Sequence, residues 1–234
     1  MTNDNPSTEI RVLEEIQQFL QSAVHDLRAA HRRTAIAAEM VRESADEQER
    51  NELTGQMLQG LSKAEGLLIG ISGYSIALVP SRYNMGTFPS SRAVRFALAN
   101  LDGKIQKAGA VVTVTELPEI PGDRDRLAEV FEHLIGNSLK FQGPDPPLIE
   151  VRSRRVAEGW LFTIKDNGIG IPMKYRDRIF IPFRRLHGAE VEGAGLGLAT
   201  SRKIIEAHGG RIWIEAEEGS GLTLAFILPA ADGD

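Results

Sequence analysis

Residues 166–172 read D-N-G-I-G-I-P, residues 179–187 read I-F-I-P-F-R-R-L-H, and residues 193–199 read G-A-G-L-G-L-A. A fourth segment lies upstream, where residues 133–141 read H-L-I-G-N-S-L-K-F. Each segment by itself is a weak signal, because glycine-rich turns and amphipathic helices are common. All four in this order and spacing are rare by chance, since the separate chances multiply, so we interpret them as parts of one site.

The first of these segments predicts a polar contact at the end of a strand. Asp166 can accept a hydrogen bond from an exocyclic amine such as the N6 group of adenine. Gly168 and Gly170 let the backbone turn tightly and pass close to a flat ring. An Asx-turn between two elements is the commoner use of such a segment when it occurs alone.

The third segment has the pattern of an anion-binding turn. Gly193, Gly195 and Gly197 precede a helix that we expect to begin near Leu196. The free N–H groups and the positive end of the helix dipole favour phosphate at such a point. A plain flexible loop is the alternative interpretation of these glycines in isolation.

The segment at residues 133–141 places two polar side chains on one face of a predicted helix, because Asn137 and Lys140 lie three residues apart. Alone, they would be a polar residue at a helix edge and a solvated lysine. Together, however, the four segments resemble the ATP-binding domain of sensor histidine kinases, in the wider gyrase/Hsp90/kinase/MutL ATPase superfamily. The resemblance implies that ATP and Mg²⁺ are bound.

The resemblance also implies roles for individual residues. Asn137 would coordinate Mg²⁺ through its carbonyl oxygen and Lys140 would neutralise phosphate, in keeping with the preference of Mg²⁺ for oxygen ligands. Arg185 would act in catalysis by contacting the γ-phosphate. The short stretch between Phe183 and Gly193 resembles a lid that closes over ATP. The implied ATP-binding residues are Asn137, Lys140, Asp166, Gly168, Gly170, Gly193, Gly195, Leu196 and Gly197.

The composition is that of an ordinary globular protein. The 234 residues are 42% hydrophobic and 25% charged, enough for one large or two small domains. A net charge of −5 gives no reason to expect nucleic acid or an anionic membrane as a partner. The chain has no cysteine, which excludes disulfides and Cys-based zinc sites. Because we find neither a spanning apolar run nor a signal-peptide pattern, we expect a cytoplasmic location.

A heptad pattern near the N-terminus predicts a long helix from about Ser7 to Glu43. One series of seam positions is mostly leucine and the other mostly alanine, which lets a neighbouring helix approach closely. The two series are Leu13, Leu20, Leu27, Thr34 and Val41, and Ile16, Ala23, Ala30 and Ala37. A second, glycine-containing helix follows to about Val79. Because a lone two-helix hairpin buries too little surface, we predict a homodimer with a four-helix bundle.

The predicted fold class is α+β, with this N-terminal helical hairpin followed by an α/β sandwich of the ATPase superfamily type. We expect the dimerisation and phosphotransfer hairpin over residues 1–80, a linker over 81–91, and the catalytic ATP-binding domain over 92–234. In that domain, predicted helices cover residues 91–107, 123–141 and 196–208. Predicted strands cover residues 110–115, 148–154, 160–165, 211–215 and 222–228 and form a largely antiparallel sheet.

His25 is the candidate phosphoacceptor among five histidines. The heptad places Ala23 and Leu27 in the seam, so His25 falls on the solvent-facing side, within reach of a partner. The letters H-D-L-R that begin at His25 resemble the phosphoacceptor box of the kinases. Asp26 could take the imidazole proton or hold its tautomer, leaving the other ring nitrogen to attack. His208 stands at a predicted helix end, where a cationic side chain suits the dipole.

Three positions depart from the pattern of the family. Ala30 replaces the usual proline, so we expect a straighter helix. Ala29 stands where kinases with strong phosphatase activity carry Thr, Asn or Gln. His133 replaces the usual Asn four residues before Asn137, a place that holds a water-activating Glu in some ATPases of the superfamily.

The resemblance covers about residues 10–229 and is closest to kinases of the phytochrome-associated type. It implies that the chain is the core of a two-component protein-histidine kinase. His25 would be phosphorylated by ATP and would pass the group to an aspartate on a response-regulator receiver domain. Ten residues before the first heptad cannot hold a sensor, so the chain is a fragment or a separate sensor protein supplies the signal. The alternatives are a phosphotransfer or scaffold protein with a degenerate ATP-binding domain, and an ATPase or serine kinase of the same superfamily.

Overall fold

The computed structural model describes residues 6–80, 83–176, 178–184, 193–215 and 221–230, with side chains described from residue 16 onward. The chain forms two compact units. One unit comprises residues 1–72 with 187–196, and the other comprises residues 73–186 with 197–234.

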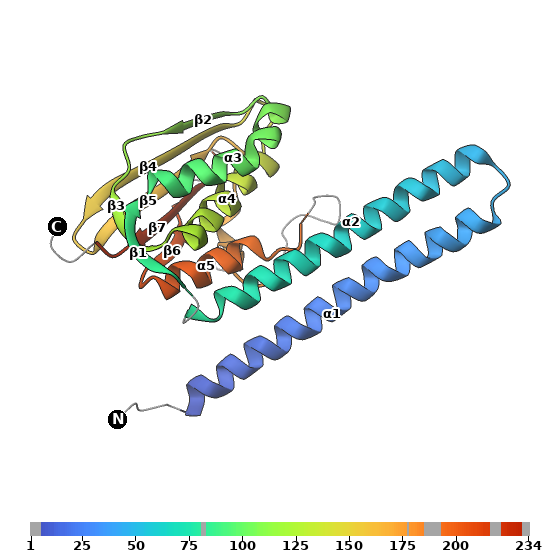
Figure 1. The fold of residues 1–234 in the computed structure, drawn as a ribbon, viewed down its shortest axis with the longest axis horizontal. Coiled ribbons are helices and arrows are strands. Elements are labelled where there is room, and N and C mark those ends of the chain that lie inside the picture. Colours follow the sequence, from blue (N-terminus) through green and yellow to red (C-terminus); the bar gives the residue numbers. More distant parts are fainter. Residues whose placement is uncertain (1–5, 81–82, 177, 185–192, 216–220, 231–234) are drawn as a thin grey trace. The chain divides into compact units, whose positions relative to one another are not determined.

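The first unit contains an antiparallel pair of long helices, α1 (Pro6–Glu43) and α2 (Glu47–Ala77) (Figure 1). The last turn of α2 belongs to the second unit. The predicted alanine series, Ala23, Ala30 and Ala37, is buried. A Cβ atom at Gly60 would overlap the side chain of Thr34, so the two helices approach closely at that level. The helical hairpin and its alanine seam are therefore confirmed.

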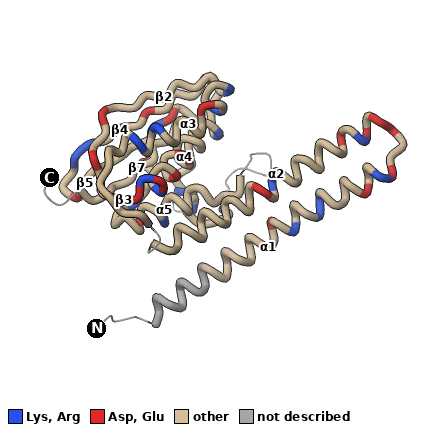
Figure 2. Tube along the Cα trace, viewed as in Figure 1, with Lys and Arg blue, Asp and Glu red and all other residues tan. Residues whose placement is uncertain are grey.

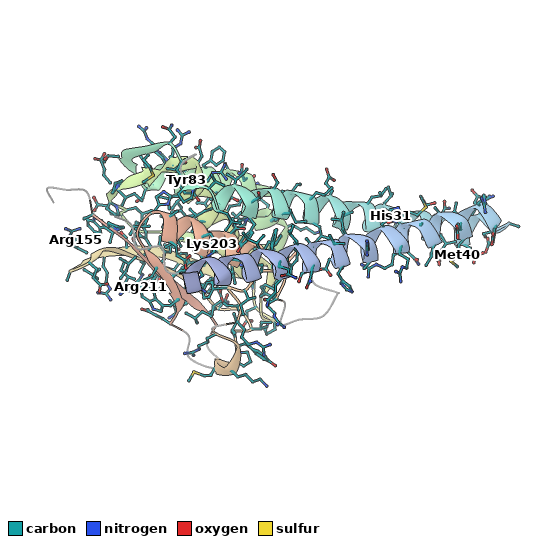
Figure 3. All side chains as sticks on the ribbon, turned by 90° about the horizontal axis from the view of Figure 1, so that it is seen from below. His31, Met40, Tyr83, Arg155, Lys203 and Arg211 are labelled. Atoms are coloured by element: carbon teal, nitrogen blue, oxygen red, sulfur yellow. The ribbon has the colours of Figure 1, made fainter. Side chains whose placement is uncertain are left out.

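A second apolar stripe remains on the surface of the hairpin, with side chains that are 39–66% exposed. It consists of Ile16, Leu20, Val24, Ile36 and Met40 on α1 and Leu58, Leu61, Leu68 and Ile69 on α2. Figure 3 labels Met40 and His31 on α1. Figure 2 shows that charged residues gather near the turn between the helices and that much of α2 beyond it is uncharged. Within the described ranges, no helix has both the length and the apolar character needed to cross a bilayer.

The described residues of the second unit form a two-layer α/β sandwich. Its strands are β1 (Met85–Pro89), β2 (Val111–Val114), β3 (Glu119–Asp123), β4 (Leu148–Val156), β5 (Gly159–Asp166), β6 (Arg211–Ile214) and β7 (Thr223–Leu228). Its helices are α3 (Ser91–Ala108), α4 (Arg124–Lys140) and α5 (Gly197–Ala207), with a short 3-10 turn η2 (Met173–Tyr175).

One five-stranded sheet has the order β2-β4-β5-β7-β6, in which β2 runs parallel to β4 and all other neighbours are antiparallel. β1 and β3 form a separate antiparallel pair. Helices α3, α4 and α5 lie on one face of the large sheet (Figure 1). This arrangement confirms the predicted α+β class and the largely antiparallel sheet.

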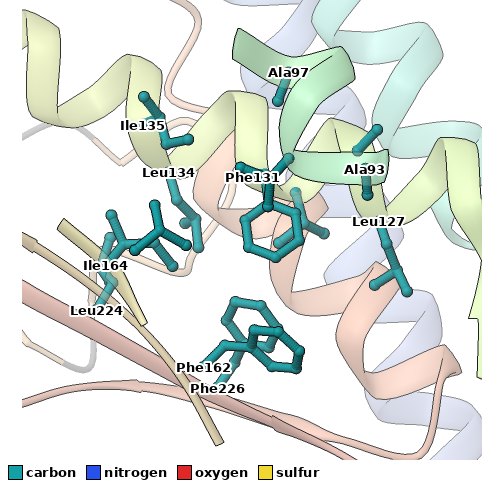
Figure 4. Packing of buried hydrophobic residues seen from close by; sticks show 14 of the residues in the cluster. Ala93, Ala97, Leu127, Phe131, Leu134, Ile135, Phe162, Ile164, Leu224 and Phe226 are labelled. Atoms are coloured by element: carbon teal, nitrogen blue, oxygen red, sulfur yellow. The ribbon is translucent and has the colours of Figure 1, made fainter. Parts of the chain in front are cut away.

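The core between the layers is built around three aromatic rings (Figure 4). Phe162 from β5 and Phe226 from β7 stack with ring centroids 5.0 Å apart. Phe131 from α4 meets both edge-on, at 5.9 Å and 5.7 Å. All three side chains are fully buried. Burial of such large apolar surfaces and edge-to-face contacts stabilise the packing of α4 on the sheet, and so position the residues that α4 carries.

Two short strands were not predicted. β1 lies inside the segment that we expected to be a linker, and β3 directly precedes α4. Both contain proline and glycine, which weaken the strand signal in sequence. They are stabilised by pairing with each other rather than by a place in the main sheet.

Candidate nucleotide-binding site

Asp166 lies at the end of β5 and is held in one orientation by hydrogen bonds from the described residues. Its Oδ2 accepts from Ser138 Oγ at 2.8 Å, and its Oδ1 accepts from the backbone N–H groups of Gly168 at 2.9 Å and Leu222 at 3.1 Å. The residue is only 7% exposed. A carboxylate offers about four acceptor positions, so one remains for a ligand donor. Sequence reasoning identified Asp166 but missed Ser138, whose side chain faces the carboxylate from α4.

The turn after Asp166 and the segment before β7 leave no room for side chains at their glycines. A Cβ atom at Gly168 would overlap the carbonyl oxygen of Phe141, and one at Gly221 would overlap that of Asp166. Gly170 has a φ of 69° and Gly221 a φ of 90°, in the region that favours glycine. The turn is thus packed closely against the end of α4 and the start of β7.

Asn167 is a structural residue that the sequence did not single out. Its Oδ1 accepts from the backbone N–H of Leu148 at 2.8 Å, and its Nδ2 donates to the carbonyl of Pro146 at 3.1 Å. The side chain therefore ties the turn after β5 to the loop before β4. Its amide groups are occupied by the backbone, so they serve the site by fixing the turn.

Asn137 and Lys140 lie near the C-terminal end of α4 and are both partly buried. As predicted, their three-residue spacing puts them on one face of the helix. The ammonium group of Lys140 lies 4.9 Å from the ring centroid of Phe141. The amide oxygen of Asn137 and the charge of Lys140 are of the types that a Mg²⁺–phosphate group requires, so the residues present fit such a group.

The predicted phosphate-binding helix begins at Gly197, one residue after the predicted start. Gly193 and Gly195 precede it with φ of 125° and 70°. Leu196 is 2% exposed. These three residues belong to the first unit and Gly197 to the second.

His133 lies one turn before Asn137 on α4 and contacts the first turn of α5. Its ring carbons would be 3.3 Å from a Cβ atom at Gly197, and its Nδ1 lies 3.4 Å from Ser201 Oγ. Burial lowers the pKa of His133 to about 4, although the carboxylate of Glu132 opposes the shift. The imidazole is therefore neutral at pH 7.

His208 follows α5 directly and is buried and neutral, which corrects the expectation of a cationic side chain. Its Nδ1 donates to the carbonyl of Ile204 at 2.7 Å, and its Nε2 accepts from the backbone N–H of Asp123 at 2.9 Å. Burial lowers its pKa, although the hydrogen bond to Ile204 and the carboxylate of Asp123 oppose the shift. The bond from the N–H of Asp123 also requires an unprotonated Nε2.

Asp123 is the N-cap of α4 and links three parts of the domain. Its Oδ1 accepts from the backbone N–H groups of Asp125 and Arg126, both at 3.0 Å. Its Oδ2 accepts from the backbone N–H of Asn84 at 2.7 Å. With the bond from its own N–H to His208, the residue joins the segment before β1, the start of α4 and the end of α5.

His25 lies on α1 of the first unit with its side chain 81% exposed, as the heptad predicted. Its Nδ1 lies 3.0 Å from a carboxylate oxygen of Asp26. An Nδ1–H that donates to this carboxylate leaves the Nε2 lone pair free. The described residues beside it, among them Val24, Arg28 and Arg32, line an open groove.

Arg185, predicted to contact the γ-phosphate, lies outside the described residues, as does most of the predicted lid. At the near end of that stretch, Phe180 is buried in the core of the second unit. Phe183 is partly buried and has a φ of 60°.

The described residues of the second unit define a class of protein: a two-layer α/β sandwich in which a buried carboxylate, Asp166, lies beside a glycine turn. Residues 122–232 match the family described as histidine kinase-, DNA gyrase B-, and HSP90-like ATPase. Sequence relatives extend the likeness across both units.

The chain is 34% identical over 219 residues, 92% of its length, to cyanobacterial phytochrome A of Nostoc sp.. It is 35% identical over 221 residues, again 92% of its length, to the phytochrome-like protein Cph1 of Synechocystis sp.. The chain spans 28% and 29% of these two relatives. The resemblance to sensor histidine kinases of the phytochrome-associated type is therefore confirmed.

A solved structure of histidine kinase ThkA in complex with response regulator protein TrrA has a similar fold. The TM-score is 0.71 at 22% identity, and the match covers 94% of this chain and 64% of that one. At this identity the likeness concerns the fold of both units.

Proposed function

We propose that the chain is the catalytic core of a two-component histidine kinase, which uses ATP to phosphorylate His25 and passes the phosphoryl group to an aspartate of a response regulator. The observation that carries the proposal is the pairing of the exposed His25 with Asp26, in the same chain as a domain of the ATPase family. An exposed histidine alone would have no such meaning.

In the transfer step, Nε2 of His25 attacks the γ-phosphorus of ATP, a new N–P bond forms, and the bond from phosphorus to the bridging oxygen of ADP breaks. Asp26 holds the Nδ1–H and stabilises the positive charge that develops on the ring. The protein's main contribution is to position the reactants and stabilise charge.

In the nucleotide site, Asp166 would accept from the adenine amine through its remaining acceptor position. Asn137 and Lys140 would face the phosphates, with Asn137 as the Mg²⁺ ligand. Mg²⁺ would neutralise charge on the phosphate oxygens. Gly193, Gly195, Leu196 and Gly197 would surround the phosphates with backbone N–H groups at the start of α5, and Arg185 would contact the γ-phosphate.

The apolar stripe of the hairpin supports a homodimer, because exposed leucines and isoleucines in this number favour burial against a second hairpin. A receiver domain is the partner that the chemistry requires, and the kinase ThkA, of similar fold, has been solved with a response regulator. The groove beside His25 offers it both apolar and basic side chains. A separate sensor protein would be a further partner.

The test is incubation with γ-labelled ATP and Mg²⁺, followed by acid and alkali treatment of the labelled chain. Label that is labile to acid and stable to alkali on the wild type, and absent on His25→Ala, is expected. His31→Ala is the matched control, because His31 is an exposed histidine of the same helix. Label that persists on His25→Ala, or that resists acid, would overturn the assignment.

A further inference from the structure

His133 is a partly buried titratable side chain for which the proposed transfer step has no use. It lies on the same stripe of α4 as Asn137 and Lys140, since these residues are spaced by four and seven positions. That stripe carries the groups proposed to bind the phosphates. The side chain is thus placed beside the phosphate end of the site without a chemical role in it.

The ring of His133 packs directly against the first turn of α5. Two of its ring carbons would lie 3.3 Å from a Cβ atom built at Gly197, and Cβ of His133 would lie 3.6 Å from it. The ring therefore fills the space that a side chain at position 197 would need, and it limits how far the helix start can approach α4. A smaller side chain at position 133 would leave a space into which the first turn of α5 could move.

A hydrogen bond joins the ring to the next turn of α5. Nδ1 of His133 lies 3.4 Å from Ser201 Oγ, and Ser201 is fully buried. The bond is long, so it adds direction more than strength. Because the ring is neutral, its effect on phosphate comes from shape and from this bond, with no attraction of charge.

We propose that His133 is a positioning residue for the phosphates: its packing beside Gly197 and its bond to Ser201 hold the start of α5 so that the N–H groups there point at the nucleotide. The inference rests on the proposed function, since it assumes that a nucleotide binds at this helix start. Free N–H groups bind phosphate well only when the helix end has the correct position.

The experiment compares affinities for ATP, ADP and adenosine, measured by competition with a fluorescent ATP analogue. His133→Ala removes the support, and we expect affinity for ATP and ADP to fall about five- to tenfold, the share that one or two hydrogen bonds contribute. Adenosine, which has no phosphate, should bind His133→Ala and the wild type with the same affinity. His133→Phe keeps a ring against Gly197 and should recover most of the loss.

Ser201→Ala tests the hydrogen bond with a minimal change to packing, and keeps the proposal testable if His133→Ala fails to fold. We expect a loss of about two- to fivefold for ATP, which should vanish when Ser201→Ala is made in the His133→Phe background. His31→Ala, on the exposed face of α1, is the control.

An equal loss for adenosine and ATP would mean a general structural role for His133, and no loss for either would mean no role; both results overturn the inference and leave the proposed function standing. Absence of nucleotide binding by the wild-type chain would instead overturn the proposed function, and the inference with it.

Discussion

Replacement of Asp166 by asparagine should separate nucleotide recognition from folding. The amide keeps the shape of the carboxylate, and its single oxygen can still accept from the N–H groups of Gly168 and Leu222. Its NH₂ group would take the place of Oδ2, which now accepts from Ser138 Oγ. Because the hydroxyl of Ser138 can turn and accept instead, the free energy of unfolding should change by about 1 kcal/mol or less.

The nucleotide should be affected far more. The amide NH₂ can only donate, so it would face the adenine amine with no acceptor. A hydrogen bond to a charged group contributes about 1.5–3 kcal/mol, which corresponds to a rise of about 10- to 150-fold in the dissociation constant for ATP. Affinity for GTP should rise relative to ATP, because guanine carries an acceptor oxygen at the corresponding position.

Isothermal titration calorimetry with ATP and GTP measures both effects, and thermal denaturation checks the fold. Asp102→Asn is the matched control, since Asp102 is an exposed aspartate of α3 in the same unit. Unchanged ATP affinity in a folded Asp166→Asn variant would refute the reasoning that the remaining acceptor position of this carboxylate reads the base.

Three further predictions concern stability and assembly. Because the folded state lowers the pKa of His208, the contribution of His208 to the free energy of unfolding should be constant above the unfolded value of about 6.5 and should fall below it, by up to about 1.4 kcal/mol per pH unit. Denaturant titrations across this range measure it as the difference between the wild type and His208→Gln, since His133, whose pKa is also lowered, acts in the same direction in both. Leu20→Glu places a charge in the exposed stripe and should convert the proposed dimer to a helical monomer, as measured by light scattering and circular dichroism. Gly221→Ala should destabilise the fold by about 1–3 kcal/mol, because its Cβ would overlap the Asp166 carbonyl. Gly55→Ala, in open space on α2, should instead stabilise the fold by up to about 1 kcal/mol. If thermal denaturation shows a similar effect for both substitutions, the packing described for Gly221 is wrong.

Local patterns predicted most of the fold. The heptad indicated which alanines of α1 are buried, because a close helix pair selects small side chains wherever it forms. The same pattern placed Leu20 in a seam, yet Leu20 is 54% exposed, whereas Thr34 of the same series packs against Gly60 of α2. A heptad identifies the apolar positions of a helix but does not say which of them a given partner helix covers.

The candidate site was predicted in part for a similar reason. Asp166 and the glycines of its turn are adjacent in sequence, so their pattern is visible there. Ser138 and Asn167 act through contacts with distant residues, Asp166 and Leu148, which only the folded chain brings together. The neutral state of His208 likewise depends on the N–H of Asp123, 85 residues away. A helix C-terminus by itself predicts a cationic histidine at this position.

The bond between His208 and Asp123 also has a consequence for the order in which the domain can form. Helix α1 and helix α2 make contacts that are close in sequence, so the hairpin can fold soon after it is synthesised. The N-terminus of α4 stays incomplete until the chain has been made through residue 208, because a ring nitrogen of that residue satisfies the N–H of Asp123. A nascent chain that ends before α5 therefore exposes an unfinished helix start and an uncovered sheet face, and closure of the domain is a late event in its synthesis.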